Sequence, residues 1–334
     1  MGTIKSLFAI DSHTAGEPLR LIVGGVPMLK GNSVSEKRDY FREHYDYLRC
    51  AIMREPRGHK DMFGAILTEP VMPEADLGVF FIHGDGYHNM CGHGSIATAT
   101  IAVDHGLVEV KEPETIIKME TPAGLVEAKV AVENGKAKRV TLKNVPSFLY
   151  KKDVCVDVPK YGKLTVDIAF GGNFFAVVPA KQLNIDICPE NTSKLAEAGM
   201  AIINAVNASV KVQHPVMDYI KGIDECEIFG PAKSPDADYQ NITIFDGQVD
   251  RSPCGTGTSS KAAVLYARGE LEIGQEFVYE SVIQTKFIGK AVEKVKVGDF
   301  DAILPEVTGS AYITGISHIM IDSDDPVKYG FVLK

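Results

Sequence analysis

Two copies of one short pattern constrain this chain more than any other feature of its sequence. The first copy reads Cys91-Gly92-His93-Gly94-Ser95, and the second reads Cys254-Gly255-Thr256-Gly257-Thr258. In both copies a run rich in alanine and aliphatic residues follows, and a glycine closes it 15 residues after the cysteine. A repeat of this kind predicts two related halves, each with a cysteine just ahead of a helix.

The cysteine of each copy occupies a chemically distinctive position. Backbone N–H groups in the first turn of a helix lack partners inside the helix, and the helix dipole adds partial positive charge there. A carboxylate can bind these N–H groups, and the glycines beside the cysteine let the backbone approach a ligand closely. The same field lowers the pKa of a thiol from about 8.5, so that thiolate forms near neutral pH.

Two such halves facing one ligand would place one thiol on each side of it. One thiolate would remove the proton from the α-carbon of a bound carboxylic acid, and the opposite thiol would return a proton to the other face. This chemistry inverts a stereocentre with no metal and no pyridoxal phosphate, because electrostatic preorganisation and exclusion of water stabilise the carbanion. We therefore expect Cys91 and Cys254 to act as the two acid–base groups of one cofactor-free site.

The rest of the chain reads mainly as short strands rich in β-branched and aromatic residues, bounded by Gly, Pro, Asp or Asn. Helical patterns are fewer and cover residues 35–53, 95–105, 191–208 and 259–268. The predicted fold class is α+β with strands dominant.

Charge and cysteine usage narrow the partners and the compartment. Lys and Arg total 35 against 44 for Asp and Glu, and this net charge of −9 argues against nucleic acid and anionic membrane surfaces as partners. The longest uncharged stretch, residues 86–103, contains too many polar residues for a membrane span. Six dispersed cysteines without a CxxC pair indicate reduced thiols, so we expect a cytoplasmic protein.

Five segments together resemble the proline racemase family, and the likeness extends over nearly the whole chain. They are residues 11–18 (DSHTAGEP), 55–59 (EPRGH), 89–94 (NMCGHG), 250–258 (DRSPCGTGT) and 308–312 (TGSAY). The resemblance implies two pseudo-symmetric domains of the fold shared with diaminopimelate epimerase, each a β-rich barrel or sheet around a central helix. It also implies an active site in the cleft between the domains, a mechanism without cofactor or metal, and a homodimer.

The expected domains follow from the repeat and from this fold. Duplicated halves commonly exchange a terminal strand, so the end of the chain is expected to return to the first half. We predict a first half made of residues 1–120 with about 312–334, and a second half made of residues 121–311.

The resemblance also suggests roles for the residues around the two thiols. His93 and Asp250 match the pair that contacts the ring nitrogen of the substrate and the thiols. The backbone N–H groups expected to hold the substrate carboxylate belong to Gly92, His93, Gly255 and Thr256.

The choice of substrate depends on a few pocket positions. Family members that dehydrate trans-3-hydroxyproline typically carry Thr at the second cysteine position, so Cys254 favours inversion. Phe63 and Phe245 match the positions that line the ring in racemases, and an apolar pocket suits proline. His88 stands where an aliphatic residue is common and offers a polar partner to a hydroxyl group, which keeps 4-hydroxyproline 2-epimerase as the alternative.

Three interpretations from other classes predict different observations. A cysteine hydrolase would use Cys91 with His93 and leave Cys254 idle, and it would form an acyl-enzyme. A zinc site built from Cys91, His93 and Cys254 would respond to a chelator. An inactive amino-acid-binding relative would keep the pocket without exchanging the α-proton.

Overall fold

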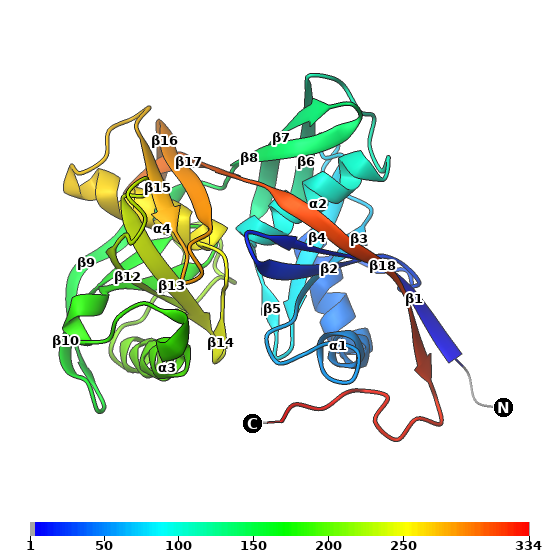
Figure 1. Cartoon of the computed structure of the whole chain (residues 1–334), viewed down its shortest axis with the longest axis horizontal. Coiled ribbons are helices and arrows are strands. Elements are labelled where there is room, and N and C mark those ends of the chain that lie inside the picture. Colours follow the sequence, from blue (N-terminus) through cyan, green and yellow to red (C-terminus); the bar gives the residue numbers. More distant parts are fainter. Residues whose placement is uncertain (1–3, 334) are drawn as a thin grey trace. The chain divides into compact units, whose positions relative to one another are not determined.

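The computed structural model describes residues 4–333, and it divides into two compact units (Figure 1). The first unit is Met1–Thr141 with Ser310–Lys334, and the second is Leu142–Gly309. The first unit extends beyond the predicted boundary at residue 120. β6 (Glu114–Thr121) pairs with another strand of the first unit, and β7 (Gly124–Glu133) pairs with β6 along the whole length of β6.

The first unit is a β-sheet with two helices. Its elements are β1 (Ile4–Thr14), β2 (Glu17–Gly24), α1 (Val34–Met53), β3 (Phe63–Thr68), β4 (Leu77–His83), β5 (Tyr87–His88), α2 (Gly92–Asp104), β6, β7 and β18 (Ala311–Asp322). β1 pairs antiparallel with β2 and β18, and Figure 1 shows β18 beside β1 although they lie at opposite ends of the chain. β2 pairs parallel with β3, β3 antiparallel with β4, and β4 antiparallel with β5 and parallel with β6.

The second unit has the same kind of elements in the same spatial order. They are β9 (Ser147–Val158), β10 (Gly162–Phe170), β11 (Phe174–Pro179), α3 (Thr192–Ser209), β12 (Glu225–Pro231), β13 (Tyr239–Phe245), β14 (Gln248–Val249), α4 (Gly255–Arg268), β15 (Glu276–Glu280), β16 (Lys286–Val297) and β17 (Phe300–Gly309). Two short 3₁₀ turns, Ala180–Gln182 and Pro189–Asn191, precede α3, and β8 (Lys136–Lys143) spans the junction of the units.

The strand pairings repeat one for one between the units. β10 pairs antiparallel with β9 and β11, β11 parallel with β12, β12 antiparallel with β13, and β13 antiparallel with β14 and parallel with β15. β9 thus holds in the second unit the place that β18 holds in the first, although one precedes and the other follows the remaining strands of its unit. This confirms the predicted pseudo-symmetric α+β fold, and β18, the last strand of the chain, pairs with β1.

The two amphipathic helices form as their sequences predict. α1 covers the predicted segment 35–53, and Ser33 caps it by accepting a hydrogen bond from Glu36 N at 3.1 Å. Phe41, Leu48 and Ile52 of α1 are fully buried in the core of the first unit. α3 covers all but the first residue of the predicted segment 191–208, because Asn191 is its N-cap, and it buries its own apolar face in the second unit.

The two helices of the repeated pattern begin earlier than predicted. α2 starts at Gly92 rather than Ser95, and α4 starts at Gly255 rather than Ser259. The reason is that each cysteine is itself the N-cap, which a propensity argument built on Ser and Thr does not anticipate. The closing glycines behave as the repeat predicts: Gly106 and Gly269 adopt the left-handed conformation just after the helix.

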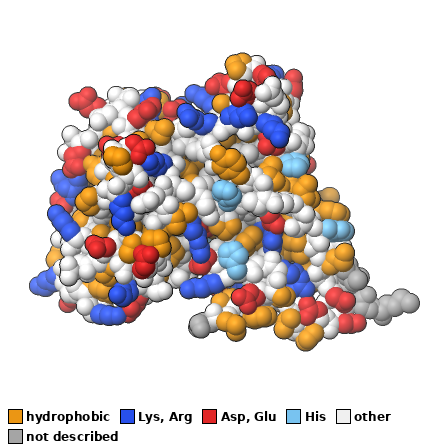
Figure 2. All heavy atoms as spheres, viewed as in Figure 1, with side chains coloured by type: hydrophobic (Ala, Val, Ile, Leu, Met, Phe, Trp, Pro, Cys, Tyr) orange, Lys and Arg blue, Asp and Glu red, His pale blue; other side chains and the backbone are white. Residues whose placement is uncertain are grey.

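Burial explains why α2 carries no Asp, Glu, Lys or Arg before its last residue, Asp104. Residues 92–103 of α2 are all buried and none of them is Asp, Glu, Lys or Arg. On the face of the molecule seen in Figure 2, basic and acidic side chains are interspersed among apolar ones. Within residues 4–333, no helix is long and apolar enough to cross a membrane.

Candidate active site

Cys91 sits at the N-terminus of α2 with its sulfur turned onto the first turn. Its Sγ accepts a hydrogen bond from Gly94 N at 3.2 Å, and its carbonyl accepts one from Ser95 N at 3.0 Å. The side chain is 5% exposed. The thiol thus acts as the helix cap, in the positive field of the helix N-terminus that stabilises a thiolate.

Cys254 repeats this geometry at the N-terminus of α4. Its Sγ accepts a hydrogen bond from Gly257 N at 3.3 Å, lies 3.5 Å from the Thr256 hydroxyl, and is 5% exposed. Two hydrogen bonds order the segment just before this cap: Cys254 N donates to Ser252 Oγ, and Ser252 N donates to Asp250 Oδ1.

The second glycine of each pattern is required because the sulfur lies against it. A Cβ at Gly94 would lie 3.0 Å from Cys91 Sγ and 2.9 Å from Phe81 Cε1. A Cβ at Gly257 would lie 3.2 Å from Cys254 Sγ and 2.6 Å from Glu227 Oε2. A side chain at either position would push the thiol off the helix end.

The two caps differ in backbone strain. Cys91 has an extended conformation with φ −143°, whereas Cys254 has φ 60° and ψ 114°. A side chain crowds the backbone at a positive φ, and residues held in such regions cost about 1–3 kcal/mol and concentrate at functional sites.

Rings surround Cys91. His93 Nδ1 lies 3.2 Å from Cys91 Sγ, and the Phe63 ring lies edge-on to the His93 ring at 4.7 Å. Phe63 also stacks on His88 at 5.5 Å and on His83 at 6.1 Å. The first unit therefore presents an aromatic, weakly polar wall beside its thiol.

The histidines of this wall are uncharged at neutral pH. Burial lowers the pKa of His93 to about 3, and neighbouring His88 adds to that effect. Burial alone lowers the pKa of His88 to about 4 and is the main reason that the pKa of His83 lies well below its ordinary value. Neutral imidazoles can each donate one hydrogen bond and accept another.

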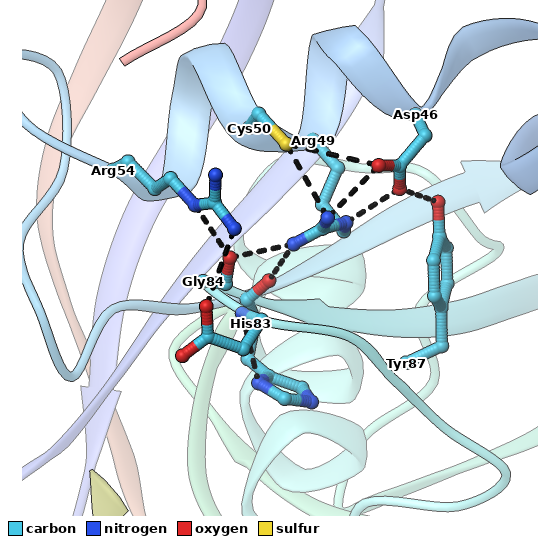
Figure 3. A network of polar contacts seen from close by, with 8 residues as sticks. Asp46, Arg49, Cys50, Arg54, His83, Gly84 and Tyr87 are labelled. Carbon is cyan, nitrogen blue, oxygen red and sulfur yellow. Dashed lines mark hydrogen bonds and ion pairs between the residues drawn. The ribbon is translucent and has the colours of Figure 1, made fainter. Parts of the chain in front are cut away.

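A polar network on α1 holds the β4–β5 turn that carries two of these histidines (Figure 3). Arg49 donates to the carbonyls of His83 and Gly84 at 2.8 and 2.7 Å, and it forms a two-bond ion pair with Asp46. The hydroxyl of Tyr87, next to His88, donates to Asp46 at 2.6 Å. Charge-assisted bonds of this kind fix both ends of the turn, and with it the placement of His83 and His88.

Carboxyl groups lie near the sulfur of Cys254, which also belongs to an apolar cluster with Phe175 and Val264. The sulfur lies 3.8 Å from Glu225 Oε2, and Asn173 Nδ2 donates to the other oxygen of Glu225 at 2.8 Å. Burial raises the pKa of Asp250 to about 6, although hydrogen bonds from Ser252 and Cys254 lower it in part. Burial, with the charges of Glu225 and Asp250, raises the pKa of the Cys254 thiol well above its ordinary value.

Most of the predicted site residues lie in these two clusters. The structure brings Phe63, His88 and His93 around Cys91, and Asp250 and Thr256 around Cys254. Gly92 and His93, like Gly255 and Thr256, supply first-turn amides of their helices. Phe245 is buried at the end of β13, where it pairs with Glu225.

Sequence reasoning missed Glu225 and His83. A signal for Glu225 was present, since residues 224–227 read Asp-Glu-Cys-Glu, and the last three of them open the buried strand β12. Acidic residues in a run that is otherwise buried indicate a polar cluster in the core.

Comparison with known proteins identifies the chain. The family model described as proline racemase matches residues 9–332. The chain is 53% identical to a proline racemase of Clostridioides difficile over 331 residues, which cover 99% of both proteins. This chain belongs to the proline racemase family. It is therefore an isomerase of the amino-acid racemase and epimerase class.

Other members of the family and its wider fold are also recognisable. A 4-hydroxyproline 2-epimerase of Streptosporangium roseum is 43% identical over all of both chains. The crystal structure of a hydroxyproline epimerase from Agrobacterium vitis, with bound trans-4-OH-L-proline, has a TM-score of 0.94 at 33% identity, covering 98% of this chain and 95% of that one. A PhzF-family protein of Bacillus anthracis shares the fold alone, with a TM-score of 0.58 at 12% identity over 95% of this chain and 99% of that one.

In this proline racemase family member, the strained cap predicts unequal responses to glycine. We expect Cys254→Gly to cost about 1 kcal/mol less unfolding free energy than Cys91→Gly, because glycine accepts a positive φ without steric cost. Each variant loses the same capping sulfur, so Cys91→Gly is the matched control. Urea unfolding followed by circular dichroism measures the difference, and equal losses would contradict the strain at Cys254.

The buried neutral histidines predict a pH dependence of stability. The folded pKa of His88, about 4, lies below its unfolded value of about 6.5, so His88 stabilises the fold fully above pH 6.5 and loses that contribution as the pH falls toward 4. The free energy that separates the wild type from His88→Gln should therefore shrink across this window, by up to about 1.4 kcal/mol per pH unit. Urea unfolding at pH 7, 6, 5 and 4 checks it, and a constant difference would refute it.

Proposed function

We propose that this chain interconverts L- and D-proline with Cys91 and Cys254 as the two acid–base groups. The observation that carries this proposal is the repeated cap, in which a thiol of each unit lies on the first turn of a buried helix. Family membership supports the reaction class, and the 53% identity to a proline racemase supports the substrate.

The reaction needs one proton to leave one face of the α-carbon and one to arrive at the other. A thiolate takes the α-proton, and the electron pair of the C–H bond stays on the α-carbon as a carbanion. The opposite thiol then gives its proton to that electron pair on the other face. The two sulfurs exchange protonation states, and no external acid, base or redox partner enters the balance.

The first-turn amides supply the charge stabilisation in this proposal. Amides of Gly92 and His93 in α2, and of Gly255 and Thr256 in α4, belong to helix N-termini that favour a carboxylate. Binding the carboxylate there also disperses the charge that develops beside it when the α-proton leaves.

His93 and Asp250 are assigned to the ring nitrogen and to the thiols. Both are buried, with 4% and 3% exposure, and each belongs to the cluster around one of the two cysteines. The cationic secondary amine of proline favours the ionised form of Asp250, and it offsets the negative charge that develops at the α-carbon. A neutral His93 can accept a hydrogen bond from the same amine.

Proline is the substrate favoured by the aromatic wall. Phe63 is 2% exposed and Phe245 is 3% exposed, and both are apolar surfaces suited to an unsubstituted ring. One observation favours 4-hydroxyproline as a second candidate: the buried imidazole of His88 stacks on Phe63 and offers a polar partner beside it.

The family assignment argues against the cysteine hydrolase. The homodimer and the cytoplasmic location stay predictions.

Exchange of the α-proton in D₂O tests the two-thiol reaction. With L-proline and no added cofactor, the wild type should bring optical rotation to zero while deuterium replaces the α-proton. Cys91→Ser and Cys254→Ser should each lose about 10²-fold to 10⁴-fold in racemisation rate, because each removes the acid–base group of one face. Cys155→Ser, at an exposed cysteine, is the matched control and should keep full activity. More than a tenth of the activity in either active-site variant would refute the pair.

The ring preference is tested by opening the aromatic wall. Phe63→Ser should shift relative kcat/KM toward trans-4-hydroxy-L-proline by about fivefold, since a hydroxyl partner compensates a buried substrate hydroxyl by about 1 kcal/mol. His88→Leu is the opposing variant and should shift the ratio toward proline. Rates measured with both substrates decide it; an unchanged ratio in Phe63→Ser with a changed one in His88→Leu would assign ring recognition to His88.

A further inference from the structure

The second unit places a buried carboxyl group against its thiol. Glu225 is 4% exposed, and its Oε2 lies 3.8 Å from Cys254 Sγ. Asn173, itself 1% exposed, holds the other oxygen at 2.8 Å, so that the carboxyl group is fixed toward the sulfur. The distance and direction suit a weak S–H to oxygen hydrogen bond with the thiol as donor.

The internal symmetry shows that Glu225 occupies the position that an aromatic residue, Phe63, holds in the first unit. Phe63 is the first residue of β3 and pairs with His83, the last residue of β4. Glu225 is the first residue of β12 and pairs with Phe245, the last residue of β13. The same place in the two sheets therefore carries an uncharged ring beside Cys91 and an ionisable carboxyl group beside Cys254.

A second equivalent position shows the same exchange. His88 pairs with Phe81 of β4, and Asp250 donates its N–H to the carbonyl of Thr243, which lies at the corresponding place on β13. The neutral imidazole of the first unit is thus an acid in the second. Two thiols that hold equivalent places in the fold have surroundings of opposite electrostatic character.

Other titratable groups face this cluster, and most of them are acids. Asp224, Asp250 and Glu227 act on Glu225, and the hydroxyl of Tyr279, bonded to Glu227, faces the same region. Two cations interact electrostatically with other acids of the cluster: Arg251 lowers the pKa of Asp250, and Lys261 lowers the pKa of Glu227. The charged groups with the largest effect on Cys254 are the acids Glu225 and Asp250.

Two acids in one buried place cannot both ionise readily. Like charges a few ångströms apart in a poorly solvated site repel strongly, so the pair loses one proton and resists losing the second. Burial and neighbouring acids raise the pKa of both Glu225 and Cys254 well above their ordinary values, but a carboxylic acid is intrinsically far more acidic than a thiol. The first proton therefore leaves Glu225, and the remaining proton stays on sulfur, shared toward the carboxylate.

We propose that Glu225 is a positioning residue that keeps the proton on Cys254 in the free enzyme, so that Cys91 is the resting base. Glu225 acts through the thiol and need not touch the substrate. The meaning of this asymmetry for catalysis rests on the proposed racemase function, but the asymmetry is a property of the protein without substrate. In the reaction, the enzyme that has just used Cys91 as base carries the less favourable charge distribution, with the proton on Cys91 and the negative charge on Cys254.

The pH dependence of alkylation tests the proposal on the whole protein without substrate. Iodoacetamide reacts with thiolate, and trypsin releases residues 252–261 as a peptide whose one cysteine is Cys254. In Glu225→Gln, the midpoint of Cys254 alkylation should fall by about one pH unit or more, and the rate at pH 8 should rise about tenfold, because the repelling carboxylate is gone. Mass spectrometry of the peptide gives the rates.

Two further variants separate this effect from a general loss of structure. Glu227→Gln removes a buried carboxyl group two residues along the same strand, bonded to Tyr279 instead of Cys254, and should leave the midpoint unchanged. Glu225→Asp keeps a carboxylate and should stay near the wild-type midpoint. A wild-type midpoint in folded Glu225→Gln, or an equal shift in Glu227→Gln, would overturn the proposal.

The wild type alone supplies a test that does not depend on folding of a variant. Residues 61–111 form a tryptic peptide whose one cysteine is Cys91, so both thiols can be followed in the same sample. Cys91 should alkylate with the lower midpoint, and the reverse order would overturn the proposal. Failure of α-proton exchange with proline would instead refute the proposed function and leave this ordering untouched.

In activity measurements, Glu225→Gln has a signature that lost packing alone would not give. The two enantiomers have equal free energy, so kcat/KM must stay equal for L- and D-proline in every variant. A changed balance between the two resting forms should instead change kcat and KM together. Both should rise for one enantiomer and fall for the other. Parallel changes for both enantiomers would contradict the role of Glu225 in setting that balance.

Discussion

The hydrogen bond from a first-turn amide to a cysteine sulfur is the interaction on which both candidate clusters depend. It occurs at 3.2 Å in α2 and 3.3 Å in α4, and it holds the sulfur at the end of the helix. Glycine must follow at the third helical position, because any side chain there would collide with the sulfur. Capping, helix dipole and glycine thus explain together why the repeated sequence pattern is so short and so specific.

Duplication has preserved the backbone while the surroundings of the thiols have diverged. The pairings of β1–β6 with β18 recur in β9–β15, even though the outer strand comes last in one unit and first in the other. Rings and neutral imidazoles gather at Cys91, and carboxyl groups gather at Cys254. A symmetric scaffold with asymmetric electrostatics suits a reaction in which one thiol must hold a proton while the other lacks it.

Burial determines the charge states in both clusters. It keeps His88 and His93 uncharged, and it raises the pKa of Asp250 to about 6. The cores that provide this burial come from ordinary amphipathic patterns, such as the apolar face of α1, whose Arg49–Asp46 pair also holds the turn before His88. In the first unit, the helix that stabilises the core therefore also positions the histidines near Cys91.

The sequence by itself determined the duplication, the α+β class, the four helices and the two cysteines, because these depend on local spacing, capping and hydrophobic period. It also predicted most residues of the two clusters through motifs adjacent to each cysteine. Only the tertiary structure decided that Glu225 lies against Cys254 and that His83 joins the wall around Phe63, since strand pairing brings together residues about 30 and 20 positions apart. The start of each helix at Gly92 and Gly255 was also decided there, because a cysteine caps a helix well only when burial and the close glycine hold its sulfur against the backbone amides.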